Sequence, residues 1–123
     1  MKVRIKGNFI RYRLSKSEVE ALSLTGIVKE TTCFGINNLF SYSLVSKDGI
    51  DNLEANFTNG NLIIFLPKEN AHNWFANSKV GYRSTVKIDE KNILVLLVEK
   101  DFQCLDETEE DQSNNYPNPI AKE

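Results

Sequence analysis

The sequence predicts an α+β fold made of a duplicated ββαββ unit, with about eight mostly antiparallel strands and two short helices. A turn followed by a strand occurs at Gly7–Leu14 and again 53 residues later at Gly60–Pro67. Each copy belongs to the same order of elements: strand, turn, strand, helix, strand, turn, strand. A gapless shift of 53 residues also pairs eight identical residues, which is more than random pairing gives. We expect the two units to form either a barrel or two facing sheets, with the helices outside or at the ends.

The length of 123 residues favours one domain, which we place at residues 1–105, with pseudo-repeats 1–50 and 51–105. The chain is 41% hydrophobic and 26% charged, which is typical of a soluble globular protein. Residues 106–123 are polar, acidic and contain Pro and Asn, so we expect a flexible tail.

The first unit contains two predicted hairpins. Residues 2–6 alternate apolar and basic side chains, the Gly7-Asn8 pair favours a turn, and residues 9–14 form the return strand. Residues 27–34 are rich in Thr and β-branched side chains, and residues 39–45 follow a second turn.

The first helix lies between these hairpins. Ser15 and Glu18 have the spacing of a capping box, in which each side chain accepts a backbone N–H of the other residue. Val19 and Leu22 share one side of the helix, and Gly26 is predicted to end it in the left-handed conformation.

The second unit repeats this order. Residues 53–57 and 62–66 flank Asn59-Gly60, a strong hairpin signal, and residues 80–88 and 93–98 form the last hairpin. The strand at 62–66 is wholly apolar, so we expect both of its faces to be covered, and the strand at 93–98 is apolar on both faces.

The second helix begins at Pro67, whose missing N–H costs nothing at a first helical position. Ala71, Trp74 and Phe75 form an apolar stripe, which predicts core residues, with an aromatic ligand platform as the alternative. His72 is the only histidine, and a metal site needs several ligands, so we expect no metal. The chain has no P-loop, dinucleotide-type Gly loop or Cys-x-x-Cys, so we expect no cofactor.

A difference between the two units predicts a ligand site. The 53-residue shift aligns Arg11 and Arg13 with the apolar Ile64 and Leu66. Two guanidinium groups on one face of a strand can hold a phosphate or carboxylate. The alternative is a solvated face, or one paired with Glu30 or with the acidic tail. The candidate ligand-binding residues are Arg4, Lys6, Arg11 and Arg13.

Two further positions receive structural interpretations. Glu30 aligns with Arg83, which suggests an ion pair near the pseudo-two-fold axis. Cys33 aligns with Val86, which predicts a small buried apolar residue.

The overall charge restricts the partners and the location. A net charge of −2 and a pI near 5.5 argue against a general nucleic-acid binder. The basic N-terminal residues lead into alternation and not into a secretory signal, and the apolar runs are far too short to span a membrane. Two cysteines without an export signal are typical of free thiols, so we expect a cytoplasmic protein.

Both ends of the chain resemble a family of small uncharacterised bacterial proteins. The resemblance depends on the opening Met-Lys-Val-Arg-Ile-Lys-Gly-Asn at residues 1–8 and on the Tyr-Pro-Asn-Pro run at 116–119. It implies no activity, but it implies that the tail contains a motif. The tail residues concerned are Cys104, Glu110 and Asp111.

A weaker, topological resemblance links a duplicated eight-stranded barrel to the triphosphate tunnel enzymes. Those enzymes begin with Glu-x-Glu-x-Lys for metal binding, where this chain has Lys2, Arg4 and Lys6. Three functions therefore stay open. They are a non-enzymatic binder of an anionic small molecule, a homodimeric interaction protein with the tail as a strap, and a phosphate-ester hydrolase of tunnel type.

Overall fold

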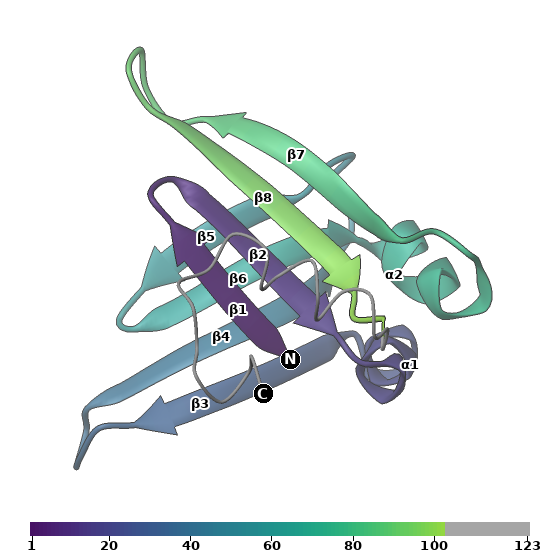
Figure 1. Cartoon of the computed structure of the whole chain (residues 1–123), viewed down its shortest axis with the longest axis horizontal. Helices are drawn as coiled ribbons and strands as arrows, with labels where there is room; N and C mark the ends of the chain where they lie inside the picture. The colour runs from purple at the N-terminus through teal and green to yellow at the C-terminus, as the bar shows by residue number, and fades with distance from the viewer. Residues whose placement is uncertain (103–123) are drawn as a thin grey trace, which may run out of the picture.

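The fold is α+β, with eight strands in two mixed sheets that face each other and two helices at one end (Figure 1). The computed structural model describes residues 1–102. The interpretations of the tail, including Cys104, Glu110 and Asp111, lie outside the described residues. Sheet A has the strand order β1-β2-β8-β7, and sheet B has the order β3-β4-β6-β5. The elements are β1 (Lys2–Lys6), β2 (Phe9–Leu14), α1 (Lys16–Thr25), β3 (Ile27–Cys33), β4 (Leu39–Lys47), β5 (Glu54–Thr58), β6 (Asn61–Pro67), α2 (Lys68–Asn73), a 3₁₀ turn (Trp74–Ala76), β7 (Gly81–Lys87) and β8 (Ile93–Lys100).

Each half of the chain contributes one hairpin to each sheet. The first and last hairpins, β1–β2 and β7–β8, meet in sheet A through the parallel pair β2–β8. The two middle hairpins meet in sheet B through the parallel pair β4–β6. The two helical connections carry the chain from one sheet to the other, and the loop between β4 and β5 stays within sheet B, so the two halves are interlocked.

The facing-sheet alternative is confirmed, and the barrel is wrong. Within residues 1–102, β1 and β7 are the edges of sheet A, and β3 and β5 are the edges of sheet B. A barrel needs these edges to pair with one another. Because the hairpins join only through their inner strands, the edges stay apart, and the resemblance to tunnel enzymes loses its structural basis.

The core lies between the sheets and is closed at one end by the helices. Tyr12, Ile64 and Leu96 are fully buried on the inner faces, and Leu22 and Trp74 cover the end of the core from the helical side. Trp74 is therefore a core residue, as predicted. Phe75 is not, since its side chain is 37% exposed.

The first helix begins and ends where the sequence predicts. The Ser15 side chain accepts the backbone N–H of Glu18, and the Glu18 carboxylate accepts the backbone N–H of Ser15 at 2.8 Å. Gly26 ends α1 with a φ of 82°, a left-handed conformation that glycine adopts without steric cost. Within the described residues, neither helix is long and apolar enough to cross a membrane.

The predicted 53-residue shift is wrong by one residue on either side of the helices. The first two strands match at a shift of 52, as for Tyr12 and Ile64 (64 − 12), and the last two at a shift of 54, as for Glu30 and Ser84 (84 − 30). Ile10 and Tyr12 point into the core from β2, as Leu62 and Ile64 do from β6. A shift of 53 would instead match Tyr12 with Phe65, which lies on the outer face. Because side chains alternate along a strand, an error of one residue exchanges the two faces.

The same correction changes two further predicted matches. By strand position and face, Glu30 corresponds to Ser84 and not to Arg83, and Cys33 corresponds to Lys87 and not to Val86. The turns differ as well. Gly7 is the first residue of its two-residue turn, with a φ of 55°, whereas Gly60 is the second residue of its turn, with a φ of 76°.

Candidate functional site

The four predicted cations lie together on the outer face of sheet A. Alternate residues of β1 pack against the core, so Arg4 and Lys6 project outward. Tyr12 is fully buried in β2, and its neighbours Arg11 and Arg13 therefore project from the other face. The alternation read from the sequence placed these side chains correctly, because both strands are half-buried.

The register of β1 and β2 brings these cations close to one another. Directly opposed residues of antiparallel strands have Cβ atoms about 4.5–5.5 Å apart. Two such pairs on this face join one cation to another, which is unfavourable unless negative charge lies nearby. The cross-strand pairs on the face are Lys2 with Arg13, Arg4 with Arg11, and Lys6 with Phe9.

Two further cations on β7 complete the surface, and the sequence-based reasoning missed their role. Tyr82 and Val86 of β7 pack against the core, so Arg83 and Lys87 project outward. They join the other cations only because β8 lies between β2 and β7 in the sheet. We call the outward cations of sheet A the cationic face: Lys2, Arg4, Lys6, Arg11, Arg13, Arg83 and Lys87.

One carboxylate of β8, that of Glu99, lies within this face. Its Oε1 is 3.8 Å from Nη1 of Arg11 and 3.8 Å from Nε of Arg13. These distances exceed a hydrogen-bond length, so the ion pairs are loose. The Arg11 and Arg13 side chains are 20% and 32% exposed. Glu99 therefore offsets part of the charge of two half-buried guanidinium groups. Asp101, directly after β8, pairs with Lys2 at 2.9 Å, and the face still holds more cations than carboxylates.

An apolar band runs through the centre of the cationic face. Phe9 on β2, with Val95 and Leu97 on β8, lies half-buried between the cations of β1 and those of β7. The predicted cover of both faces of residues 62–66 is wrong as well, because Ile63 and Phe65 are only half-buried on the outer face of β6. A ligand with an apolar part can pack on this band while its anionic groups reach the cations at either side.

The cationic face ends at a hollow beside the first turn of α1. This hollow has a volume of about 330 Å³ and combines two cations of the face with serine hydroxyls. Two carboxylates also contribute to its wall, so its charge is mixed. The lining residues are Met1, Lys2, Arg13, Ser15, Ser17, Glu18 and Asp101.

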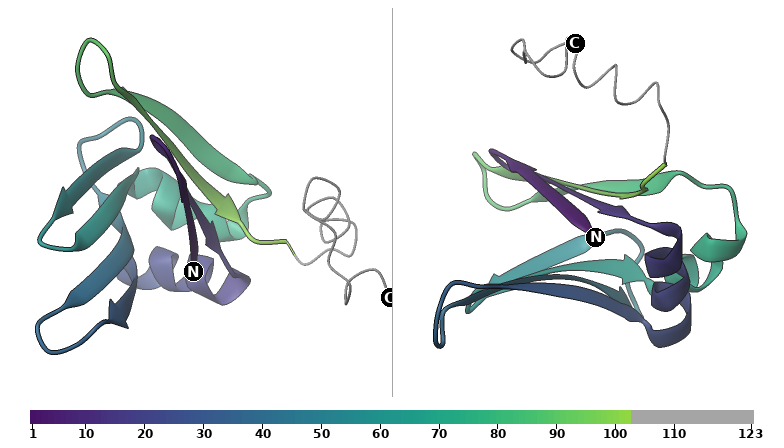
Figure 2. Two further views of the ribbon diagram at one scale, coloured as in Figure 1. Left: turned by 60° about the vertical axis from the view of Figure 1, so that its left-hand side comes forward. Right: turned by 60° about the horizontal axis from the view of Figure 1, so that its bottom comes forward.

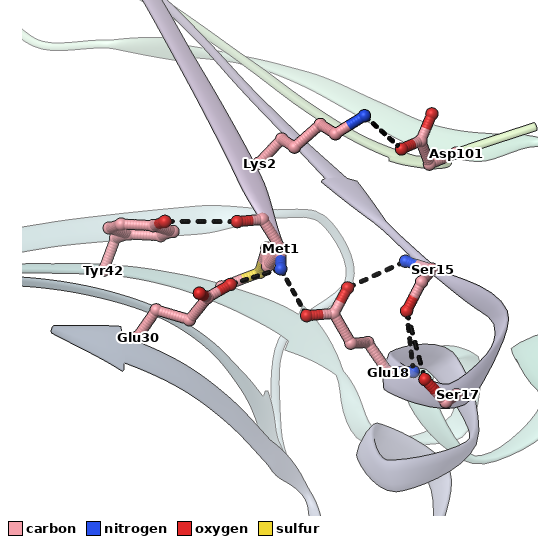
Figure 3. A network of polar contacts seen from close by, with 8 residues as sticks. All are labelled: Met1, Lys2, Ser15, Ser17, Glu18, Glu30, Tyr42 and Asp101. Carbon is pink, nitrogen blue, oxygen red and sulfur yellow. Dashed lines mark hydrogen bonds and ion pairs between the residues drawn. The ribbon is translucent and has the colours of Figure 1, made fainter.

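A polar network holds β1 in place beneath this hollow (Figure 3). The α-ammonium of Met1 forms ion pairs with Glu18 of α1 and Glu30 of β3, and it is shielded from solvent. The Tyr42 hydroxyl of β4 donates a hydrogen bond to the Met1 carbonyl at 3.1 Å. The start of β1 is thereby fixed to α1 and to sheet B.

The same contacts shift the pKa values of the network. Burial alone would lower the pKa of the Met1 amine, but the Glu18 and Glu30 carboxylates outweigh burial and raise it. Burial alone would raise the pKa of Glu18, but the ammonium and Ser15 outweigh it and lower the pKa. Burial, helped by the charges of Glu30 and Glu18, raises the pKa of Tyr42.

Three predictions about other residues need correction or comment. Glu30 contacts Met1 between the sheets while Arg83 lies on the outer face, so their predicted ion pair is wrong. Cys33 is exposed, not buried, because it ends β3 on the outer face of sheet B. His72 is exposed on α2, and among residues 1–102 no three His, Cys, Asp or Glu side chains converge as metal ligands.

A larger hollow lies elsewhere, beside α2 and the start of β7. It has a volume of about 460 Å³, and Asn52, Asn70, Asn73 and Asn77 contribute to its polar wall. Arg83 is its only member from the cationic face among the lining residues.

Comparison with known proteins gives a family without an assigned activity. Searches of curated proteins and of solved structures found no match. Residues 1–120 match the model of a family of unknown function, DUF7009. Since this match covers nearly all of the sequence, the chain belongs to the DUF7009 family of unknown function.

Proposed function

We propose that this protein binds, on its cationic face, a small ligand or short polymer that carries several phosphate or carboxylate groups. The observation that carries this proposal is the crowding of seven cations on one face of sheet A against two carboxylates of the described residues, that of Glu99 and that of Asp101, which pairs with Lys2. Because the sequence predicts a cytoplasmic protein, we propose cytoplasmic phosphate-bearing metabolites as the ligand class.

The spacing of the cations favours more than one anionic group. Arg11 and Arg13 are two residues apart on a strand, which separates them by about 6.5–7 Å. Arg4 lies one strand away from Arg11, at roughly 5 Å. Each guanidinium offers donors in a planar fork that matches phosphate and carboxylate oxygens. An array of this kind suits a chain of phosphates better than a single anion.

The other sheet supports the view that the fold does not require these cations. Ile63 and Phe65 take, on the outer face of β6, the places that Arg11 and Arg13 take on β2. Both pairs are half-buried next to a parallel strand. Apolar residues thus satisfy the same structural position, which favours a functional reason for the arginines.

We also propose that the two halves derive from one ββαββ unit. The strand order of sheet A reads like that of sheet B when β1 is matched to β5, β2 to β6, β8 to β4 and β7 to β3. The buried helix residues Val19 and Leu22 then correspond to Ala71 and Trp74. Structures of other family members would test this proposal, since the correspondence must recur in them.

Calorimetric titration with inorganic tripolyphosphate at low and at moderate salt tests the binding function. We expect binding that weakens with salt, and a loss of at least about tenfold in affinity for the double variant Arg11→Gln/Arg13→Gln. The matched control is Lys29→Gln/Lys47→Gln, which removes two cations from the outer face of sheet B. Equal losses of affinity in both variants would show that only the overall charge matters. If the wild-type protein binds none of tripolyphosphate, nucleoside triphosphate and citrate, the proposal is refuted.

A further inference from the structure

All four hairpin turns lie at the end of the molecule opposite the helices (Figure 2). β2 and β8 run parallel from their turns toward the helices, and β6 and β4 do the same in sheet B. The two sheets are closest at the helical end and diverge toward the turns. We call this the hairpin end.

Large apolar side chains stand exposed at the hairpin end. On the inner faces, Ile5 and Phe57 are 54% and 63% exposed. Phe34 and Ile88, which directly follow β3 and β7, are 68% and 56% exposed. Inner-face positions nearer the helices, such as Leu14, are fully buried. The diverging sheets therefore leave part of their apolar inner surface without cover. The exposed apolar residues of this end are Ile5, Phe34, Ile36, Leu39, Phe57, Ile88 and Ile93.

This exposure recurs in both halves of the chain. Ile5 of β1 and Phe57 of β5 hold the same position relative to their hairpin turns. The same is true of Leu39 and Ile93, which begin β4 and β8 and are about equally exposed. A single exposed Ile or Leu is ordinary on a protein surface, but a set that repeats in two halves of different sequence is not.

We propose that the hairpin end is the surface through which two copies of this chain associate as a symmetric dimer. An aromatic side chain can bury roughly 200 Å². Two of the seven, Leu39 and Ile93, begin β4 and β8 on the outer faces of opposite sheets. The other five, each more than half exposed, offer on the order of 500 Å² per copy. This lies in the upper part of the ~300–600 Å² range of the largest apolar patch on a typical monomer. Two copies together reach the ~1,000 Å² that a specific interface needs.

The composition of the turns also fits a second copy. The turns at residues 7–8, 35–38 and 59–60 contain Gly, Asn and Ile and no charged residue. Two copies can therefore approach without burying charge, and interface centres are typically depleted of charge. The fourth turn, at residues 89–92, contains charged residues and suits the rim. A surface repeated about a pseudo-two-fold axis can meet its own copy in a two-fold dimer.

This interface leaves the centre of the cationic face, around Arg11 and Arg13, accessible, while Lys6 and Lys87 lie at its border. The dimer therefore does not depend on the proposed ligand. The test is sedimentation velocity from micromolar to millimolar protein, without ligand. We expect the wild type to dimerise and Ile5→Ser/Phe57→Ser to raise the dimer dissociation constant by at least about tenfold. Both substituted side chains are exposed, so the variant should fold, and circular dichroism checks this.

The control variant is Leu24→Ser, which removes a 79% exposed apolar side chain from α1 at the helical end. We expect it to dimerise like the wild type. As a second measurement, the amide NMR signals of Gly7 and Gly60 should shift with protein concentration while that of Gly26 stays constant. A wild-type protein that stays monomeric at every concentration overturns the proposal, whether or not an apolar dye binds at this end. A folded Ile5→Ser/Phe57→Ser variant that dimerises normally, or a Leu24→Ser variant that does not dimerise, overturns it equally.

Discussion

Arg4 and Arg11 are directly opposed on β1 and β2, and both side chains project from the outer face of sheet A. Like charges in such a pair repel and destabilise the sheet. Glu99 on β8 faces Arg11 from the other side at 3.8 Å and offsets only part of this repulsion. The like-charged pairs of the cationic face therefore cost stability, which the binding role that we propose would explain.

Replacing Arg4 by Thr should stabilise the protein and weaken ligand binding. The change removes the repulsion from Arg11 and introduces a residue that favours strands, so the free energy of unfolding should rise by about 0.2–1 kcal/mol. Urea unfolding measures this gain, and titration with tripolyphosphate measures the loss of affinity. Lys29→Thr on β3, which lies opposite Ser43, should change neither quantity beyond its small effect on strand propensity. Lower stability of the Arg4→Thr variant would contradict the repulsion.

Replacing Glu99 by Gln should tighten the binding of an anionic ligand. The substitution keeps the shape of the side chain and removes the negative charge next to Arg11 and Arg13. We expect an affinity for tripolyphosphate that rises severalfold at low salt and a smaller gain at high salt. The matched control is Glu54→Gln on β5, whose carboxylate pairs with Lys47 at 3.3 Å on the other sheet. An unchanged affinity in the Glu99→Gln variant would place the ligand away from this carboxylate.

The Met1 network should make stability depend on pH at both ends of the range. The pKa of Glu18 is lowered in the folded state, so its contribution is present above the ordinary value of 4.5 and is lost as the pH falls through the lowered value. The pKa of the Met1 amine is raised, so its contribution is present below the ordinary value of 8.0 and is lost as the pH rises through the raised value.

Thermal unfolding across this range checks both directions. The melting temperature of the wild type should exceed that of Glu18→Gln most clearly between about pH 5 and 8. Glu20, on the exposed side of α1, provides the matched control, and Glu20→Gln should follow the wild type at every pH. A constant difference between wild type and Glu18→Gln from acid to alkaline pH would show that Glu18 acts through shape alone.

The two hairpin glycines should differ in their tolerance of a side chain. A Cβ at Gly60 would lie 2.6 Å from the Leu39 carbonyl oxygen, at a φ of 76°. A Cβ at Gly7 would have no neighbour within 4 Å, at a φ of 55°. Gly7→Ala should therefore cost about 1–2 kcal/mol of backbone strain alone, and Gly60→Ala should cost clearly more. Chemical unfolding of the two variants compares them, and equal losses would contradict the close contact with Leu39.

The sequence predicted the local elements well because their signals are local. Ser15, Glu18 and Gly26 set the ends of α1 through bonds within a few residues, and the alternation of β1 and β2 placed Arg4, Lys6, Arg11 and Arg13 on one face. The sequence did not predict the correct alignment of the two halves. More identical residues pair at a shift of 53 than at the structural match, so the identities favoured the wrong shift. Only burial in the structure shows which face of a strand each residue occupies.

Residues distant in the chain decided the rest of the site. Arg83 and Lys87 join the cationic face only because β8 pairs with β2 in parallel, and Glu18 meets Glu30 only through the Met1 ammonium. By itself the sequence determined which residues form strands and helices and which side of each strand is charged, because those properties depend on neighbours along the chain. The tertiary structure alone decided that the sheets stay open, which cations share a surface and which apolar residues remain exposed. These properties depend on pairing and packing between distant segments, for which the order of residues in one strand carries no signal.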